Sequence, residues 1–163
     1  MIPISIQDIL GATADILVVS ANPSLLAGSG ISGVIHKAAG PQLKAKPFAP
    51  LTPRQAIITP AFNLSAKYVI HTVCPRYMDG QRGEAEQLYN AYASALALHS
   101  EAPDAKSIAF VTMGTGVYKW PMALAADIAV KALLTSTFDQ TLICVMDDAT
   151  RVVYQKALDC HRN

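Results

Sequence analysis

Short runs of consecutive apolar residues are the feature that most restricts the fold of this chain. Ile16–Ser20 and Ile108–Met113 are largely apolar at successive positions and do not alternate with polar residues. A strand of this kind is buried on both faces, as in a parallel sheet that helices cover on two sides. The same pattern predicts strands at Ala56–Thr59, Tyr68–Val73 and Leu142–Met146.

Helix-like runs separate most of these strands, and they are Val34–Ala39, Glu84–His99, Met122–Leu134 and Thr150–Leu158. Their apolar residues recur at helical spacing, as Leu88, Tyr92 and Ala95 do. Alternating strands and helices predict a three-layer α/β/α sandwich. No helix separates Ala56–Thr59 from Tyr68–Val73, so a hairpin there would make the sheet mixed but largely parallel. The length of 163 residues fits one domain, residues 1–163.

Composition excludes several classes of protein. Apolar residues make up 52% of the chain, which argues against disorder. The net charge is +1 and the Lys and Arg residues are scattered, so nucleic acid is not an expected partner. Any bound phosphate is then expected to be held by backbone N–H groups. No apolar run approaches the roughly 18 to 20 residues that span a membrane, so no membrane partner is expected.

The three cysteines, Cys74, Cys144 and Cys160, are far apart and lack the spacing of a metal site. Cys74 and Cys144 lie in strand-like runs, where free cysteine usually acts as a small hydrophobe. Residues 1–3 lead directly into a strand-like segment, which is unlike a signal peptide. We therefore expect reduced thiols, a cytoplasmic location and no bound metal.

Two glycine loops carry the first indication of function. Residues 26–33 read Leu-Ala-Gly-Ser-Gly-Ile-Ser-Gly, and residues 113–118 read Met-Gly-Thr-Gly-Val-Tyr. Each loop follows a strand-like run and opens a helix-like run, where free N–H groups and the helix dipole attract anions. Neither loop contains the Gly-Lys-Ser/Thr of a Walker motif, and either one alone is consistent with a plain turn. Two such loops together indicate a cradle for two linked phosphates.

Asn22 is a polar residue at the end of the first long strand. Ligands of open α/β sheets bind outside the carboxyl ends of the strands, which would let Asn22 contact a ligand. The alternative is a turn residue that bonds its own backbone. The spacing leaves both interpretations open.

Five ordered segments resemble macrodomains, a family that binds ADP-ribose. They are Asp8-Ile9, Ser20-Ala21-Asn22, the first glycine loop with residues 34–40, Tyr68–Val73, and the second glycine loop. The resemblance runs from Ile6 to about Leu158 and is closest to single-domain bacterial members. It implies a mixed sheet flanked by helices, with ADP-ribose or an ADP-ribosylated protein as the partner and no separate cofactor.

The resemblance also implies roles for single residues. Asp8 would accept a hydrogen bond from the adenine amino group, beside the N–H of Ile9, although a turn or cap residue is the alternative. Asn22 and Tyr118 would lie at the distal ribose, and Met146 stands where relatives often have an aromatic residue near adenine. The diphosphate would lie between Gly28, Ser29, Gly30 and Ile31 on one side and Gly114, Thr115, Gly116 and Val117 on the other.

The sequence departs from the hydrolytic relatives where catalysis is concerned. These relatives have an aspartate at the position of Ser32 and an asparagine at that of Val19. A serine hydroxyl is a poor general base, and Ser32 could instead cap the following helix. His36 lies one helical turn later and has a pKa suited to acid–base work, although it could also only buttress the helix. Asn22, Ser32 and His36 are therefore the candidate catalytic residues.

Three other positions also bear on the site. Lys119 and Trp120 stand where relatives commonly have glycine and an aromatic residue. Lys119 would reach the distal phosphate or ribose, or point into solvent. His71 lies in a strand-like run that looks buried, and it is interpreted as a core histidine with its hydrogen bonds satisfied. The functional hypotheses are an ADP-ribose-binding protein, a hydrolase of O-acetyl-ADP-ribose or protein mono-ADP-ribose, and a non-catalytic reader of ADP-ribose, poly(ADP-ribose) or RNA.

Overall fold

The structure is a computed structural model that describes residues 2–21, 31–44, 56–114 and 118–162. Within these ranges the side chains of residues 21, 31–34 and 43–44 are not described. The elements follow the order β1 (Ile4–Ile6), η1 (Ile9–Gly11), β2 (Ile16–Ala21), α1 (Ile31–Ala39), α2 (Pro41–Lys44), β3 (Ala56–Pro60), β4 (Tyr68–Val73), α3 (Glu84–Ala97), η2 (Leu98–Glu101), β5 (Ser107–Val111), α4 (Met122–Leu133), β6 (Gln140–Val145) and α5 (Asp148–Arg162).

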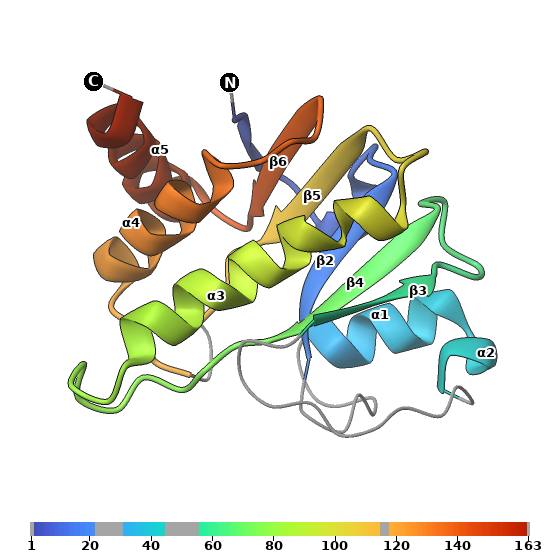
Figure 1. Cartoon of the computed structure of the whole chain (residues 1–163), viewed down its shortest axis with the longest axis horizontal. Helices are drawn as coiled ribbons and strands as arrows, with labels where there is room; N and C mark the ends of the chain where they lie inside the picture. The colour runs from blue at the N-terminus through green and yellow to red at the C-terminus, as the bar shows by residue number, and fades with distance from the viewer. Residues whose placement is uncertain (1, 22–30, 45–55, 115–117, 163) are drawn as a thin grey trace.

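The strands of the described residues form one sheet in the order β1-β6-β5-β2-β4-β3. Neighbours along β1, β6, β5, β2 and β4 are parallel, and β3 pairs antiparallel with β4 at the edge. The predicted hairpin between Ala56–Thr59 and Tyr68–Val73 is therefore confirmed. Because five strands are parallel, their carboxyl ends lie along a single edge of the sheet (Figure 1).

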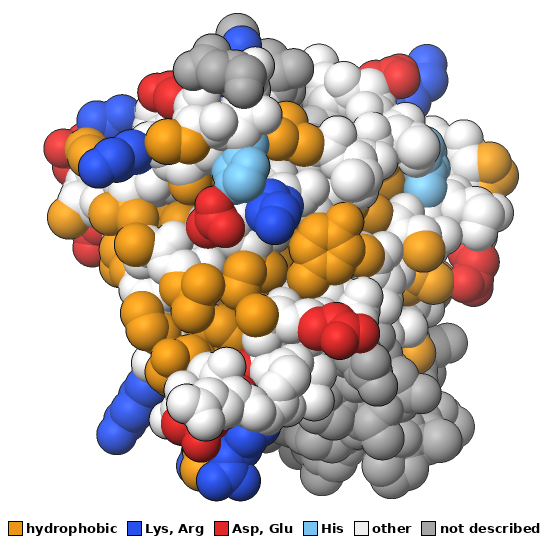
Figure 2. Space-filling view, turned by 60° about the vertical axis from the view of Figure 1, so that its left-hand side comes forward, with side chains coloured by type: hydrophobic (Ala, Val, Ile, Leu, Met, Phe, Trp, Pro, Cys, Tyr) orange, Lys and Arg blue, Asp and Glu red, His pale blue; other side chains and the backbone are white. Residues whose placement is uncertain are grey.

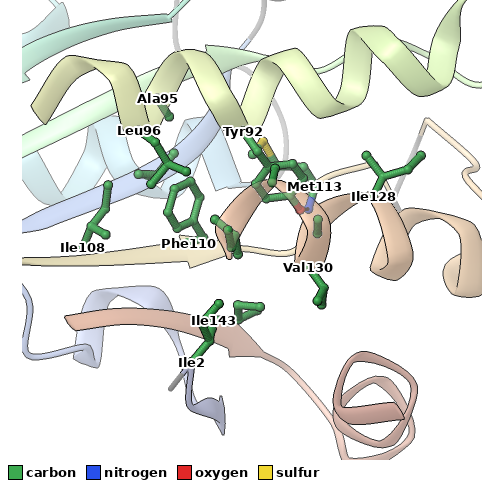
Figure 3. Packing of buried hydrophobic residues seen from close by; sticks show 14 of the residues in the cluster. Ile2, Tyr92, Ala95, Leu96, Ile108, Phe110, Met113, Ile128, Val130 and Ile143 are labelled. Atoms are coloured by element: carbon green, nitrogen blue, oxygen red, sulfur yellow. Dashed lines mark hydrogen bonds between the residues drawn. The ribbon is translucent and has the colours of Figure 1, made fainter. Parts of the chain in front are cut away.

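Helices cover both faces of this sheet, as predicted for an α/β/α sandwich (Figure 1). Alternate residues of β2 show the two-sided burial directly. Ile16 and Val18 belong to the large core under α3, α4 and α5, and Val19 packs with Ile35 of α1 on the opposite face. Figure 3 shows the large core from close by, with Leu96 of α3 beside Phe110 of β5.

Some element ends differ from those expected, for local reasons. β5 ends at Val111 because the N–H of Met113 donates to the hydroxyl of Tyr92, 3.0 Å away, instead of to a neighbouring strand. Helix α5 begins at Asp148, because Asp147 caps it by accepting a hydrogen bond from the N–H of Thr150 at 2.7 Å.

Three further ends also shift. The strand predicted to end at Met146 ends at Val145. Helix α1 begins at Ile31, which puts Ser32 inside its first turn and not at the N-cap position. Helix α3 ends at Ala97, because the chain tightens into the 3-10 turn η2.

The cysteines lie as expected of small hydrophobes. Cys74 and Cys144 are buried free thiols, and Cys160 is exposed. Burial raises the pKa of Cys74 to about 12. None of the helices that the structure describes has the length and hydropathy needed to cross a membrane.

The face formed by α4 and α5 carries exposed hydrophobic side chains, including Leu124 and Val152. Figure 2 shows hydrophobic side chains gathered on this side of the molecule, with Lys, Arg, Asp and Glu interspersed around them. The described residues on this face therefore carry no continuous basic stripe of the kind that binds a nucleic-acid backbone.

Candidate functional site

The candidate site lies along the edge where the parallel strands end. Asp8 follows β1, Met146 follows β6, Gly114 follows β5, and Asn22 would follow β2. These strands are consecutive in the sheet, so the edge from β1 to β2 spans roughly 14 Å at the usual spacing of strands. Segments far apart in the sequence thus meet at one edge, as the sequence predicts for a ligand site.

Asp8 is exposed and caps the 3-10 turn η1. Its Oδ1 accepts a hydrogen bond from the N–H of Leu10 at 2.9 Å. The side chain of Ile9, the next residue, is buried. The cap role is therefore present and uses Oδ1, so Oδ2 is the oxygen that a second donor would bind. A carboxylate that is held by its own backbone is a preorganised acceptor.

The end of β6 lies beside Asp8. The N–H of Gln7 donates to the carbonyl oxygen of Val145 at 3.0 Å. Burial, and after it the negative charge of Asp8, raise the pKa of the Cys144 thiol to about 11. Met146 follows with 76% of its surface exposed. Met146 and the Asp8 carboxylate thus lie at this end of the edge. An apolar side chain and an acceptor suit a ligand with an aromatic base that carries a hydrogen-bond donor.

The second glycine loop begins at Gly114, which has a φ of +91°. A Cβ there would lie 2.5 Å from Cδ1 of Trp120, so only glycine fits this close approach to the indole. The N–H of Trp120 donates to the carbonyl oxygen of Gly114 at 3.0 Å. Trp120 thereby fixes the first residue of the loop.

The other end of this loop lies against the connection between β4 and α3. The N–H of Tyr77 donates to the carbonyl oxygen of Tyr118 at 3.1 Å. The guanidinium of Arg76 lies 5.8 Å from the centre of the Tyr118 ring, within range of a cation–π contact. Tyr118 is half-buried, and Lys119 is exposed with a φ of +60°. A left-handed backbone of this kind favours glycine, the residue that the family resemblance implies at the position of Lys119.

Helix α1 brings Ser32 and His36 one turn apart, as expected. His36 is buried, and its ring centre lies 6.3 Å from that of His71 on β4. Such a position between helix and sheet fits the buttress interpretation of His36. Its catalytic role stays a prediction.

His71 is the core histidine that the sequence predicts. It is buried, and its Nε2 lies 3.1 Å from Oγ1 of Thr59 on the neighbouring strand. Burial, followed by the charge of His36, lowers the pKa of His71 to about 4. The ring is therefore neutral at physiological pH and serves packing.

Several predicted site residues lie outside the described residues. They are Asn22, then Gly28, Ser29 and Gly30 of the first loop, and Thr115, Gly116 and Val117 of the second. For Ile31 and Ser32 the structure describes the backbone only. The predicted site residues whose side chains are described are Asp8, Ile9, His36, Gly114, Tyr118 and Met146.

Three residues that position the second loop were not assigned to the site from the sequence. They are Tyr92, whose hydroxyl accepts from the N–H of Met113, Trp120, which packs on Gly114, and Glu84, which holds the turn before α3. The single Trp next to a glycine loop was an available signal for Trp120. No local pattern marks the other two, because their partners are distant along the chain or are backbone groups.

The described residues include no group of three His, Cys, Asp or Glu side chains that could hold a metal ion. A surface hollow of about 610 Å³ lies at the amino ends of β5 and β6, away from the candidate site, and is lined in part by His99, Ser100 and Thr137. The Nε2 of His99 donates to the carbonyl oxygen of Ala105 at 3.1 Å, so its Nδ1 accepts from the hydroxyl of Thr137 at 2.8 Å. His99 thus links η2 to the segments before β5 and β6, which is a structural role.

Known proteins resemble the chain in sequence. A family model described as Macro domain matches residues 18–129. A macro domain-containing protein of Lactiplantibacillus plantarum is 41% identical over 159 residues, which cover 93% of this chain and 92% of that protein. An O-acetyl-ADP-ribose deacetylase of Klebsiella pneumoniae is 41% identical over 162 residues, with 93% of this chain and 92% of that protein covered.

Solved structures resemble the fold. The Oceanobacillus iheyensis macrodomain with ADP matches with a TM-score of 0.87 and 30% identity, over 98% of this chain and 90% of that one. The Trypanosoma brucei macrodomain in complex with ADP-ribose matches with a TM-score of 0.82 and 27% identity, over 96% of this chain and 68% of that one. The matches in sequence and in fold each cover most of the chain, and the chain belongs to the macrodomain family.

Proposed function

We propose that this protein binds ADP-ribose, or an ADP-ribosyl group on a protein, along the carboxyl edge of its parallel strands. The observation that carries the proposal is the placement of Asp8 and Gly114 at one edge, on strands that both flank β6. The Asp8 carboxylate, which would bind the amino group of the base, and the glycine loop at Gly114, which would bind the phosphates, are thus separated by a single strand, β6. The structures of relatives with ADP and with ADP-ribose support the same ligand class.

Backbone groups supply the anion contacts in this proposal. Hydrogen bonds from N–H groups to a charged oxyanion are roughly twice as strong as neutral pairs, so a cationic clamp is not required. Arg76 and Lys119, the cationic side chains next to the second loop, are both exposed. Their charge adds general attraction for a diphosphate without a fixed contact.

Titration calorimetry tests the proposal. We expect micromolar or tighter binding of ADP-ribose and clearly weaker binding of ADP, because ADP lacks the distal ribose. No heat with millimolar ADP-ribose would contradict the proposal, and a steep loss of RNA affinity with added salt would favour the RNA-interaction alternative.

We propose hydrolysis of O-acetyl-ADP-ribose as a second candidate function. The observation that favours it is the 41% identity to a relative named for this deacetylation, over 92% of that relative's length. Water would add to the acetyl carbonyl carbon, the ester bond to the ribose oxygen would break, and that oxygen would take a proton as acetate leaves. The departure at Ser32 leaves the general base unassigned, with Asn22 and His36 as the other candidates.

Product analysis separates the two functions. Incubation with O-acetyl-ADP-ribose and with a mono-ADP-ribosylated protein, each followed over time, would release acetate or free ADP-ribose if the protein is a hydrolase. Binding without turnover of either substrate would instead identify a non-catalytic reader.

A further inference from the structure

Glu84 is a carboxylate enclosed by backbone N–H groups. It is the first residue of α3 and is only 3% exposed. Its Oε2 accepts hydrogen bonds from Met78 at 2.7 Å, Asp79 at 3.0 Å and Gly80 at 3.0 Å, and its Oε1 accepts one from Arg82 at 2.7 Å. A carboxylate has about four acceptor sites, so the backbone of residues 78–82 saturates it.

The charge of Glu84 is kept by these contacts. Burial raises the pKa of the carboxyl group, but the four backbone hydrogen bonds together lower it by more, so the pKa is about 2. The group is therefore ionised at physiological pH and holds the segment from Met78 to Arg82 as a fixed turn.

The residues just before this turn contact the second glycine loop. The indole Nε1 of Trp120 donates to the carbonyl oxygen of Pro75 at 2.9 Å. The ring of Tyr77 packs on that of Trp120, with centres 5.1 Å apart, and its N–H holds the carbonyl oxygen of Tyr118. Residues 75–77 thus bind both ends of the loop, since Trp120 in turn fixes Gly114.

We propose that Glu84 is a positioning residue for the diphosphate side of the ligand site. It does not touch the ligand. It holds the connection between β4 and α3, which in turn sets the positions of Gly114 and Tyr118. The inference rests on the proposed binding of ADP-ribose, and it adds a buried carboxylate on a different element as a determinant of affinity.

The variant Glu84→Gln tests this role. Glutamine has the same shape, but its amide offers one oxygen and directs an NH₂ group at N–H donors, so the turn loses part of its support. We expect the affinity for ADP-ribose to fall by about tenfold. The affinity for adenosine, followed by NMR titration, should stay unchanged because adenosine lacks the diphosphate. The control Glu101→Gln makes the same charge change at an exposed position in η2 and should leave both affinities unchanged.

A purely structural role for Glu84 would lower both affinities together, and that result would overturn the inference. Unchanged ADP-ribose affinity in a folded Glu84→Gln variant would overturn it as well. If this variant does not fold, Trp120→Phe removes the hydrogen bond to Pro75 and part of the ring packing on Gly114 and Tyr77. It should show the same selective loss, whose absence would contradict the inference. Failure of the wild type to bind ADP-ribose would overturn the proposed function first, so the two failures are distinguishable.

Discussion

The indole of Trp120 lies where a side chain on Gly114 would have to be. A Cβ on Gly114 would come within 2.5 Å of Cδ1 and 2.9 Å of Cγ of the indole. The indole cannot withdraw freely, since its Nε1 is bonded to Pro75 and its ring packs on Tyr77. The position of the Trp120 ring therefore restricts the backbone at the start of the second glycine loop.

Replacement Gly114→Ala should destabilise the protein by about 2 to 4 kcal/mol, because it adds a clash to the strain of a left-handed backbone. ADP-ribose affinity should fall with it. Denaturant unfolding measures the first effect and calorimetry the second. The matched control is Gly83→Ala, since Gly83 has a φ of +76° but nothing within 4 Å of a Cβ.

Gly83→Ala should cost only about 1 kcal/mol, which is the backbone strain alone. Equal losses of stability in the two variants would mean that the contact with Trp120 contributes nothing.

The base end of the site gives a second prediction, at Asp8. Asp8→Ala removes both the cap on Leu10 and the second carboxylate oxygen. We expect a loss of about 1 kcal/mol in stability and of about tenfold in ADP-ribose affinity. Asp8→Asn should retain the cap, because its amide oxygen can still accept from the backbone.

A ligand change isolates the adenine contact. In the inosine analogue of ADP-ribose a carbonyl oxygen replaces the 6-amino group, so position 6 of the base cannot donate to a carboxylate. The wild type should bind this analogue more weakly than ADP-ribose, whereas Asp8→Ala should bind both alike. A preference for adenine that survives in Asp8→Ala would show that another group reads the base.

Much of the fold was predictable because its causes are local. The apolar runs of β2 and β4 predict strands buried on both faces. No helix separates β3 from β4, which favours the hairpin that the structure has. The start of α5 could also be predicted, since Asp147 is a standard cap residue. It lies three positions before Thr150, where the sequence predicts the helix to begin.

The contacts between loops were not predictable in the same way. The hydrogen bond from Trp120 to Pro75 joins residues 45 positions apart, and the sequence contains no periodicity that links them. Glu84 has the acidic character common in the first turn of a helix, which conceals its contacts with the preceding turn. Lys119 likewise has a left-handed backbone, which lysine seldom adopts, so its residue type did not predict this conformation.

A third prediction concerns catalysis at Ser32. Ser32→Asp would supply the carboxylate of hydrolytic relatives in the first turn of α1, and general base catalysis typically contributes about 10²- to 10⁴-fold. We expect the rate of acetate release from O-acetyl-ADP-ribose to rise by at least about tenfold. Ser32→Asn is the control, because it has the same shape and no base. Equal rates in the two variants would contradict the assignment of the missing base to this position.

The last prediction is the acid stability of the protein, through His71. Its pKa is about 4 in the folded state against 6.5 for an unperturbed histidine, because burial and then the charge of His36 disfavour the protonated ring. Between these two pH values the unfolded chain binds a proton that the folded chain does not, so stability rises with pH and falls on acidification. The difference of roughly 2.5 pH units corresponds to about 3 kcal/mol lost from pH 7 to pH 4.

Denaturant unfolding at a series of pH values measures this loss. In His71→Gln the amide remains within reach of Thr59 but does not titrate, so the free energy of unfolding should depend less on pH between 6.5 and 4. Below pH 4 both proteins should lose stability alike, because the carboxyl groups then titrate, Glu84 with a pKa of about 2 among them. An unchanged slope between pH 6.5 and 4 in His71→Gln would show that His71 is not the group responsible.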